Sequence, residues 1–220
     1  MGRSLFSEIT KITLKIFFDL DGPILDVSKR YYRVFRDVCP DNVAINKKDF
    51  WKLKQNKTSW KVIFKKAKVD IKEDKFKKLW MDRIETKDYL GLDVLQPKAK
   101  RVLFNLSKKY PLFLLSLRQS KTNLYWQVDK IGISKYFKKI IYCKHKKEFP
   151  WSVKAELIRK YLSKDELALV VGDSEVDIKA AKLSKVRSIG ITSGIRSPKL
   201  LAKEKPDILI PNIQLLTKLI

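Results

Sequence analysis

The sequence predicts an α/β fold, a doubly wound parallel sheet into which a separate helical segment is inserted. Three observations predict it. Short apolar runs recur along the chain, and they are continuous rather than alternating, as is typical of parallel strands buried on both faces. Segments with apolar residues at helical spacing lie between these runs. A long stretch near the start contains helical patterns but no convincing strand.

The first apolar run, residues 14–18 (LKIFF), is followed at once by the turn residues DLDGP of positions 19–23. An apolar run that stops at Asp and Gly predicts a buried strand leading into a turn. Five later runs have the same character and are the remaining expected strands: 111–116, 139–142, 167–172, 186–191 and 207–210.

Helical patterns separate the later strands. Two of them have the spacing of one helix face: Ala99, Val102, Leu103 and Leu106, and then Leu157, Ile158 and Tyr161. Alternation of strand and helix predicts a parallel sheet whose strands all end at the same edge. Ligands bind at that edge in open α/β sheets, so residues that follow the strands are the first candidates for a site.

The stretch from residue 27 to residue 95 is expected to be a helical insertion. It contains three apolar stripes at helical spacing: Tyr31, Val34, Phe35 and Val38; Trp60, Ile63, Phe64 and Ala67; Phe76, Leu79, Trp80 and Ile84. We therefore expect residues 1–26 and 96–220 to form the α/β core domain and residues 27–95 a second, helical domain.

Composition narrows the class of protein. The chain of 220 residues is 45% hydrophobic, which suffices for one core with a smaller insertion. Its formal net charge of +25 attracts anions, but the Lys residues are spread along the chain, which favours a solvated surface.

Cys39 and Cys143 are far apart in the sequence, and no apolar run is long enough for a membrane span. We therefore expect a cytoplasmic protein with reduced cysteines. The sequence contains no pattern that predicts its oligomeric state.

Polar side chains lie at or directly after the ends of three of the predicted strands. Asp19 and Asp21 follow the first, Ser116 closes the run 111–116, and Asp173 follows the run 167–172. A carboxylate such as Asp19 can attack phosphorus and form an aspartyl phosphate. Carboxylate and phosphate repel each other unless a cation lies between them, and Mg²⁺ suits a site of oxygen ligands.

Four motifs in this order resemble those of the haloacid dehalogenase-like superfamily. They are FFDLDGPILD, LLSLRQS, a Lys at the start of KAELIRKYL, and VVGDSEVDIKAA, and the resemblance runs from about residue 14 to the C-terminus. It is closest to the phosphoglycolate-phosphatase-like branch, in which a helical cap follows the first motif. The resemblance implies that residues 27–95 are this cap and that the protein is a Mg²⁺-dependent phosphatase acting on a small phosphorylated metabolite.

The resemblance also implies a role for each motif residue. Asp19 is the nucleophile and, with Asp173, a Mg²⁺ ligand. Asp21 contributes its backbone carbonyl to the metal, while its side chain protonates the leaving group and later activates water. Ser116 and the main-chain N–H groups beside it, at Leu117 and Arg118, bind the phosphoryl oxygens. Lys154 neutralises charge in the transition state, and Asp177 supports the metal or holds Lys154.

Several assignments stay open at this stage. Lys147 also fits the position of the family's Lys motif, although Lys154 is preferred because it opens the helix before the GD strand. Pro23 and Ser184 depart from the usual residues of the family without removing a catalytic group. The true dehalogenases lack an Asp at the position of Asp21, which argues against dehalogenation.

Substrate contacts are sought in the polar break 54–59 (KQNKTS) between two helical stripes of the insertion. Lys54 or Lys57 there could face an anionic substrate, and solvated lysines are an equally good interpretation. Arg118 is a further candidate for a substrate contact. The aromatic residues of the insertion are interleaved with Lys, as in single-strand nucleic-acid binders, but their helical spacing favours a core of the insertion.

Two other functions remain open. A phosphomutase of the same fold would return the phosphoryl group to its substrate. A basic nucleic-acid-binding protein with an idle active site would bind nucleic acid with a steep salt dependence, but no RNA-binding motif or zinc spacing supports it. The single histidine, His145, lies in KHKKE, which indicates a surface loop and argues against histidine-based catalysis.

Overall fold

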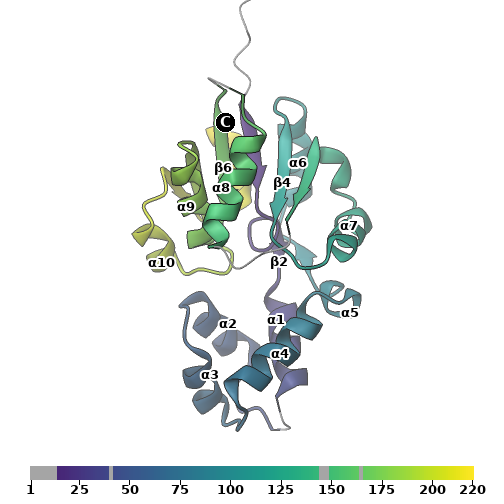
Figure 1. The fold of residues 1–220 in the computed structure, drawn as a ribbon, viewed down its shortest axis with the longest axis vertical. Helices are drawn as coiled ribbons and strands as arrows, with labels where there is room; N and C mark the ends of the chain where they lie inside the picture. Colours follow the sequence, from purple (N-terminus) through teal and green to yellow (C-terminus); the bar gives the residue numbers. More distant parts are fainter. Residues whose placement is uncertain (1–13, 40–41, 144–148, 164–165) are drawn as a thin grey trace, which may run out of the picture.

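The computed structural model describes residues 14–39, 42–143, 149–163 and 166–220. Six parallel strands form one sheet in the order β5-β4-β1-β6-β7-β8 (Figure 1). Their bounds are β1 (Lys15–Phe18), β4 (Leu112–Ser116), β5 (Lys139–Tyr142), β6 (Ala168–Gly172), β7 (Arg187–Ile191) and β8 (Ile208–Ile210). All six strands that the sequence predicts are present, and the doubly wound parallel sheet is confirmed.

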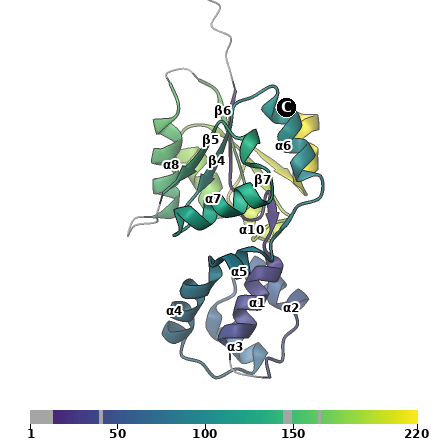
Figure 2. The same ribbon diagram turned by 90° about the vertical axis from the view of Figure 1, so that its right-hand side faces the viewer.

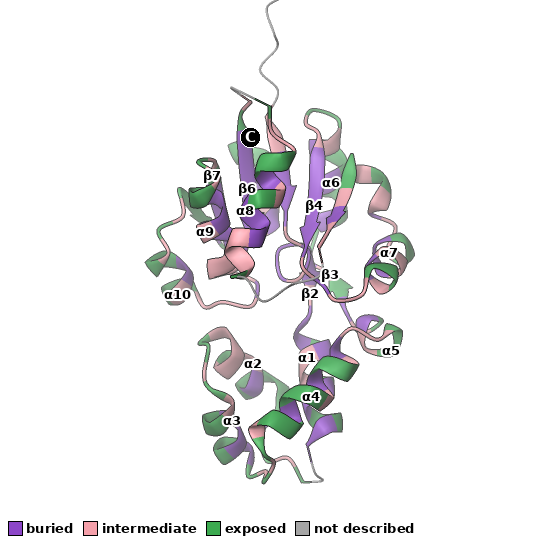
Figure 3. Ribbon diagram, viewed as in Figure 1, coloured by how far each residue is buried: buried purple, intermediate pink, exposed green. Residues whose placement is uncertain are grey.

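Helices cover both faces of this sheet, as Figure 2 shows with α8 on one side and α6 on the other. The helices are α6 (Ala99–Ser107), α7 (Lys121–Lys130), α8 (Pro150–Lys160), α9 (Glu175–Leu183), α10 (Pro198–Lys203) and α11 (Leu216–Leu219), with two 3₁₀ turns, Ser134–Tyr136 and Ile213–Leu215. Successive side chains of β1 point to opposite faces. Ile16 and Phe18 pack with residues of α6 and α7, while Phe17 packs with residues of α8 and α9. The central strands β1, β4 and β6 are therefore buried on both sides (Figure 3), whereas the edge strands β5 and β8 keep exposed residues.

In its described residues, 27–39 and 42–95, the insertion contains five helices that enclose a buried hydrophobic cluster. They are α1 (Ser28–Val38), α2 (Lys47–Gln55), α3 (Trp60–Ala67), α4 (Glu73–Ile84) and α5 (Lys87–Leu90). The three predicted stripes lie on α1, α3 and α4. Their residues Phe35, Phe64 and Phe76 join Phe50 and Trp80 in one aromatic core, so these rings are not a surface platform for nucleic-acid bases.

One expectation for this stretch is wrong in detail. No strand was expected between residues 27 and 95, but Val94 and Leu95 form β3, which pairs antiparallel with β2 (Leu25–Asp26). A strand of two residues has no periodicity that a sequence pattern could reveal. This short ribbon joins the two connections between the insertion and the sheet, at the edge where β1 and β6 end.

Among the described residues, no helix is long and apolar enough to cross a membrane.

Candidate active site

Three neighbouring strands of the sheet end at one cavity. β4, β1 and β6 lie side by side, and each delivers a polar residue at or directly after its carboxyl end: Ser116, Asp19 and Asp173. The backbone N–H of Asp19 donates to the carbonyl of Val171 at 2.9 Å, which continues the pairing of β1 with β6 up to the site. All three side chains line a cavity of about 330 Å³.

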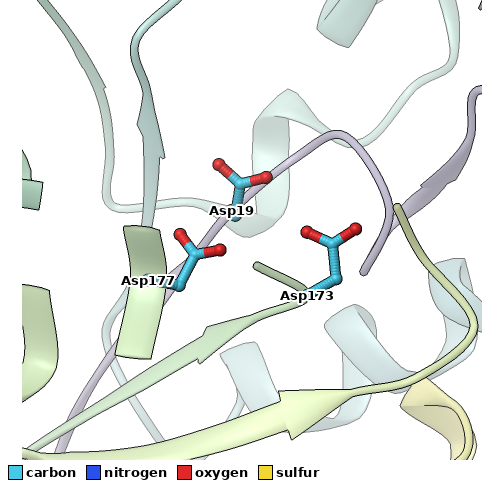
Figure 4. A group of neighbouring side chains, drawn as sticks. All are labelled: Asp19, Asp173 and Asp177. Carbon is cyan, nitrogen blue, oxygen red and sulfur yellow. The ribbon is translucent and has the colours of Figure 1, made fainter. Parts of the chain in front are cut away.

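A compact acidic group lies at one side of this cavity. Ligand oxygens of Asp19, Asp173 and Asp177 all lie within 4.8 Å of one another. Figure 4 shows the three carboxyl groups gathered around a common space, from the ends of β1 and β6 and the first turn of α9. Burial raises the pKa of Asp19 to about 7, with Lys154 opposing the rise and Asp177 adding to it. Burial, together with the negative charges of Asp19 and Asp177, raises the pKa of Asp173 well above its ordinary value.

This donor set fits a divalent cation. Buried carboxylates that raise one another's pKa are relieved when a cation neutralises them. All available donors are oxygens, which matches the preference of Mg²⁺. The family resemblance implies Asp19 and Asp173 as side-chain ligands, and both carboxylates face the same space (Figure 4).

Two glycines leave the space that the Asp173 carboxylate occupies. A Cβ atom on Gly22 would lie 1.8 Å from Asp173 Oδ2, and one on Gly194 would lie 1.9 Å from the same oxygen. The backbone N–H of Ile195 donates to this oxygen at 2.5 Å. The loop after β7 therefore fixes the orientation of Asp173.

Lys154 lies against two members of the acidic group, Asp19 and Asp177, and is 5% exposed. Its Nζ donates to Asp19 Oδ1 and to Asp177 Oδ1, both at 2.6 Å. Burial alone would lower its pKa, but the two carboxylates outweigh burial and raise it. The other oxygen of Asp177 accepts from the backbone N–H and the hydroxyl of Ser174, which completes a capping box at the start of α9. Asp177 thus holds Lys154.

Lys154 differs from the sequence expectation in one respect. It does not open its helix, because α8 begins at Pro150 and Lys154 lies in the second turn. Lys147, the alternative for the same role, and His145 lie outside the described residues.

Asp21 is held by two arginines. Arg118 donates to both of its carboxylate oxygens, with Nε 3.2 Å from Oδ2, and Arg30 Nη2 lies 2.9 Å from Oδ2. Burial alone would raise the pKa of Asp21, but Arg118 and Arg30 outweigh burial and hold it well below its usual range. Asp21 is therefore ionised in this arrangement, whereas the predicted acid role needs its protonated form.

Arg118 lines the cavity, but its guanidinium group is already bound. Besides Asp21 it contacts the side-chain oxygen of Gln127, to which Nη1 donates at 2.5 Å. Its backbone N–H lies 3.4 Å from Ser116 Oγ. Leu117 also lines the cavity. The main-chain role predicted for residues 117 and 118 fits this placement better than a side-chain contact between Arg118 and the substrate.

Lys54 and Lys57 are not among the residues that line the cavity, and their role as substrate contacts stays a prediction. Lys54 Nζ lies 4.1 Å from the ring centroid of Trp60, within the insertion. Lys57 Nζ pairs with Glu175 Oε1 at 2.9 Å. In this structure the ammonium group of Lys54 therefore faces an aromatic ring, and that of Lys57 faces a carboxylate.

Several residues at the cavity carry no signal that a single sequence reveals. The insertion contributes Tyr31 and Glu85 to the cavity wall. Glu85 accepts from the backbone N–H groups of Gln119 and Ser120, at 2.8 and 3.0 Å, and so connects the end of α4 to the start of α7. Arg30 belongs to no motif.

Comparisons with known proteins show which proteins this chain is similar to. The "Putative pyrophosphatase PpaX" of Caldanaerobacter subterraneus subsp. tengcongensis is 28% identical over 228 residues, which span 96% of this chain and 95% of that protein. A haloacid dehalogenase-like family hydrolase from Streptococcus pneumoniae has a TM-score of 0.70 at 18% identity, covering 94% of this chain and 98% of its own.

Two further solved structures share the fold. A predicted phosphoglycolate phosphatase from Haemophilus somnus has a TM-score of 0.68 at 21% identity, covering 96% of this chain and 99% of its own. YfnB from Bacillus subtilis, solved bound to magnesium, has a TM-score of 0.63 at 16% identity, covering 95% and 99%. The model of one family, described as haloacid dehalogenase-like hydrolase, matches residues 16–191. Because this match spans well over half of the sequence, the chain belongs to the haloacid dehalogenase-like hydrolases.

Proposed function

We propose that the protein is a Mg²⁺-dependent phosphatase that moves the phosphoryl group of a small metabolite first to Asp19 and then to water. The observation that carries this proposal is the meeting of Asp19, Asp173 and Lys154 at one cavity from three separate elements. A carboxylate nucleophile, an all-oxygen cation site and a buried ammonium group are the parts that phosphoryl transfer requires.

Asp19 and Asp173 would hold Mg²⁺ by their side chains and Asp21 by its backbone carbonyl, as the family resemblance implies. The bound cation would neutralise the phosphate and so permit the approach of a second anion. The attack itself is made by Asp19: its carboxylate oxygen forms a bond to phosphorus while the bond from phosphorus to the leaving oxygen breaks. Lys154, 2.6 Å from Asp19 Oδ1, stabilises the charge that develops on the transferring group.

Asp21 is assigned the proton transfers. It would protonate the leaving alkoxide in the first step and accept a proton from water in the second, when that water attacks phosphorus and releases Asp19 and inorganic phosphate. The ionised form that Arg30 and Arg118 favour is the form required for the second step. The first step needs a proton on Asp21, which these two ion pairs oppose.

The cavity supports a small substrate. Its volume is about 330 Å³, at the lower end of the range for ligand pockets. From the insertion only Tyr31 and Glu85 line it, among the residues that the structure describes. A phenol and a carboxylate favour a leaving group with hydroxyl or amino groups over one with a second anionic group, such as glycolate or phosphate.

The test is Mg²⁺-dependent phosphate release from 4-nitrophenyl phosphate, compared between the wild type and Asp19→Asn. Asp19→Asn should lose about 10³-fold or more of the activity, because the nucleophile is removed. Asp82→Asn, on an exposed position of α4, is the matched control and should retain full activity. Full activity in Asp19→Asn would refute the mechanism.

The same assay discriminates the two alternatives. With a hexose monophosphate as substrate, a phosphomutase would yield the isomeric sugar phosphate, whereas a phosphatase yields inorganic phosphate and free sugar. A nucleic-acid-binding protein with an idle site would release no phosphate from any member of a metabolite panel, and its binding to nucleic acid would fall steeply with salt.

A further inference from the structure

Arg30 is the largest of the fully buried side chains, at 1% exposure, and it lies between two carboxylates. Its Nη2 is 2.9 Å from Asp21 Oδ2 and its Nε is 3.1 Å from Asp93 Oδ1. These distances make ion pairs, although the angles do not meet hydrogen-bond geometry. Nη1 also lies 3.3 Å from the carbonyl of Ile84 and donates to it. A single guanidinium therefore joins Asp21 to Asp93.

The contacts continue from Asp93 and return to Asp21. The second oxygen of Asp93 accepts from Gln127 Nε2 at 2.8 Å. Gln127 Oε1 accepts from Arg118 Nη1 at 2.5 Å, and Arg118 pairs with Asp21. Asp21, Arg30, Asp93, Gln127 and Arg118 thus form a closed ring in which two carboxylates balance two guanidinium groups. We call these five residues the Asp21 ring.

The ring spans both connections between the insertion and the sheet. Asp21 precedes β2 on the outgoing connection, and Asp93 precedes β3 on the returning one. Arg30 is in the first turn of α1, while Gln127 is on α7 beside the sheet. Figure 1 shows α1 and β2 at this junction. The position of Asp21 therefore depends on residues from both sides of the junction.

The exposed fractions of the side chains in the Asp21 ring indicate its role. The side chains of Asp93, Arg30 and Arg118 are 0%, 1% and 5% exposed, whereas that of Asp21 is 25% exposed and lines the cavity. Ion pairs with this little exposure are weak stabilisers, because desolvation offsets most of their attraction, but they fix geometry. The four buried residues of the ring thus hold Asp21, the residue of the ring whose carboxylate is partly exposed to the cavity.

We propose that Arg30 and Asp93 are positioning residues for Asp21, aiming its carboxyl group at the leaving-group oxygen; this rests on the proposed phosphatase function. Arg30 acts because its planar guanidinium contacts two carboxylates at once, and a lysine ammonium at the same position cannot span them in the same way. Displacement of a proton-transfer group by about 1 Å is enough to lower its effect by about 10²-fold.

The leaving group supplies the test. Departure of 4-nitrophenolate needs no proton, whereas departure of an alkoxide from an alkyl phosphate such as glycerol phosphate does. We expect Arg30→Lys, which keeps the charge, to lower kcat/KM by about tenfold or more for the alkyl phosphate and by less than about threefold for 4-nitrophenyl phosphate. Asp21→Asn should give the same imbalance, more strongly. Arg33→Lys, an exposed position of the same helix, should leave both values unchanged.

Asp93→Asn provides the second variant, because it keeps the shape of the side chain and removes the negative charge that pairs with Arg30 Nε. It should show the same imbalance between the two substrates, so the test does not depend on whether Arg30→Lys folds. Equal losses on both substrates, with the imbalance still present in Asp21→Asn, would overturn the positioning role and leave a structural one. Failure of the proposed function itself would be seen separately, as full activity of Asp19→Asn or as no imbalance in Asp21→Asn.

Discussion

At the scale of single residues, the site requires two glycines, because their lack of a side chain leaves room for the Asp173 carboxylate. Asp173 occupies space that a side chain on Gly22 or Gly194 would fill. Gly22 has a φ of +116°, so its backbone also requires glycine. Gly194 has no such φ, and its requirement is close approach alone. An alanine at position 194 therefore tests the close approach to Asp173 without also requiring a positive φ angle.

Gly194→Ala should therefore weaken the cation site. The added Cβ would lie 1.9 Å from Asp173 Oδ2 and 2.5 Å from Asp173 Cβ, so turning the carboxylate does not relieve the clash and the two backbone segments have to move apart. We expect the Mg²⁺ concentration for half-maximal activity to rise by about 10–100-fold, with the fold retained. Gly91→Ala, where the nearest atom would lie 3.2 Å away at the end of α5, is the control. A wild-type Mg²⁺ requirement in Gly194→Ala would show that Asp173 does not ligate the ion.

Sequence reasoning reaches only part of this scale. Asp19, Ser116 and Asp173 were predictable because each follows a strand, and parallel strands end together. The partners of Asp21 were not. Arg30 stands next to an apolar stripe, and Asp93 lies 72 positions after Asp21 in a segment without pattern. Which polar side chains meet inside a fold depends on tertiary contacts, and spacing along the chain does not encode them.

At the scale of elements, α2 is a helix for which the sequence contains little predictive pattern. Of its nine residues only Phe50 is buried, and four are Lys, so no apolar stripe marks it. Its end nevertheless contacts the sheet domain: Gln55 Nε2 donates to the carbonyl of Gly194, and the backbone N–H of Ser197 donates to that of Gln55, both at 2.9 Å. Lys47, Lys48 and Lys52 are exposed, whereas Lys54 is partly buried against the ring of Trp60. A lysine on the buried side interrupts the apolar pattern that would otherwise reveal the helix.

Lys54 on α2 gives a stability prediction with a defined pH dependence. Burial, and secondarily Arg196, lowers its pKa in the folded state from 10.5 to about 8. The unfolded chain then binds more protons between these values, so stability rises with pH from about 8 to 10.5, and the buried charge is unfavourable at pH 7. Lys54→Met should therefore stabilise the protein at pH 7 by about 1 kcal/mol, after the lost contact with Trp60 is subtracted.

Urea unfolding at pH 7 and near pH 10.5 measures this effect, and the gain should vanish at the higher pH. Lys52→Met, on an exposed position of the same helix, should change stability little at either pH. The same variant also tests the predicted substrate contact. A stable Lys54→Met protein with a greatly raised KM would mean that Lys54 binds the substrate after all.

At the scale of the whole molecule, charge and core are distributed differently. The chain has a formal net charge of +25, whereas its cavity is lined by four carboxylates, from Asp19, Asp21, Glu85 and Asp173. A positive field attracts phosphorylated substrates from a distance, and the local carboxylates then select for a cation. The basic surface is therefore compatible with a metabolite phosphatase, and nucleic-acid binding is not needed to explain it.

The buried clusters are distributed over two regions. One cluster lies within the insertion, around Phe35, Phe50 and Phe76, and the sheet has a cluster on each face. If residues 27–95 form a domain, as the sequence predicts, loss of packing in the insertion should leave the sheet intact. The Asp21 ring and the contacts of α2 work against this independence, because they join the two regions.

Phe76→Ala decides between these descriptions. Phe76 is fully buried, and its truncation should reduce local stability by about 3–5 kcal/mol. We expect faster amide hydrogen exchange in α1, α3 and α4, with exchange in β1, β4 and β6 unchanged. Phe113→Ala, in β4 at 4% exposure, should give the opposite pattern. Equal acceleration in both regions of the Phe76→Ala protein would mean that the insertion and the sheet unfold as one unit, because the ring and the α2 contacts couple them.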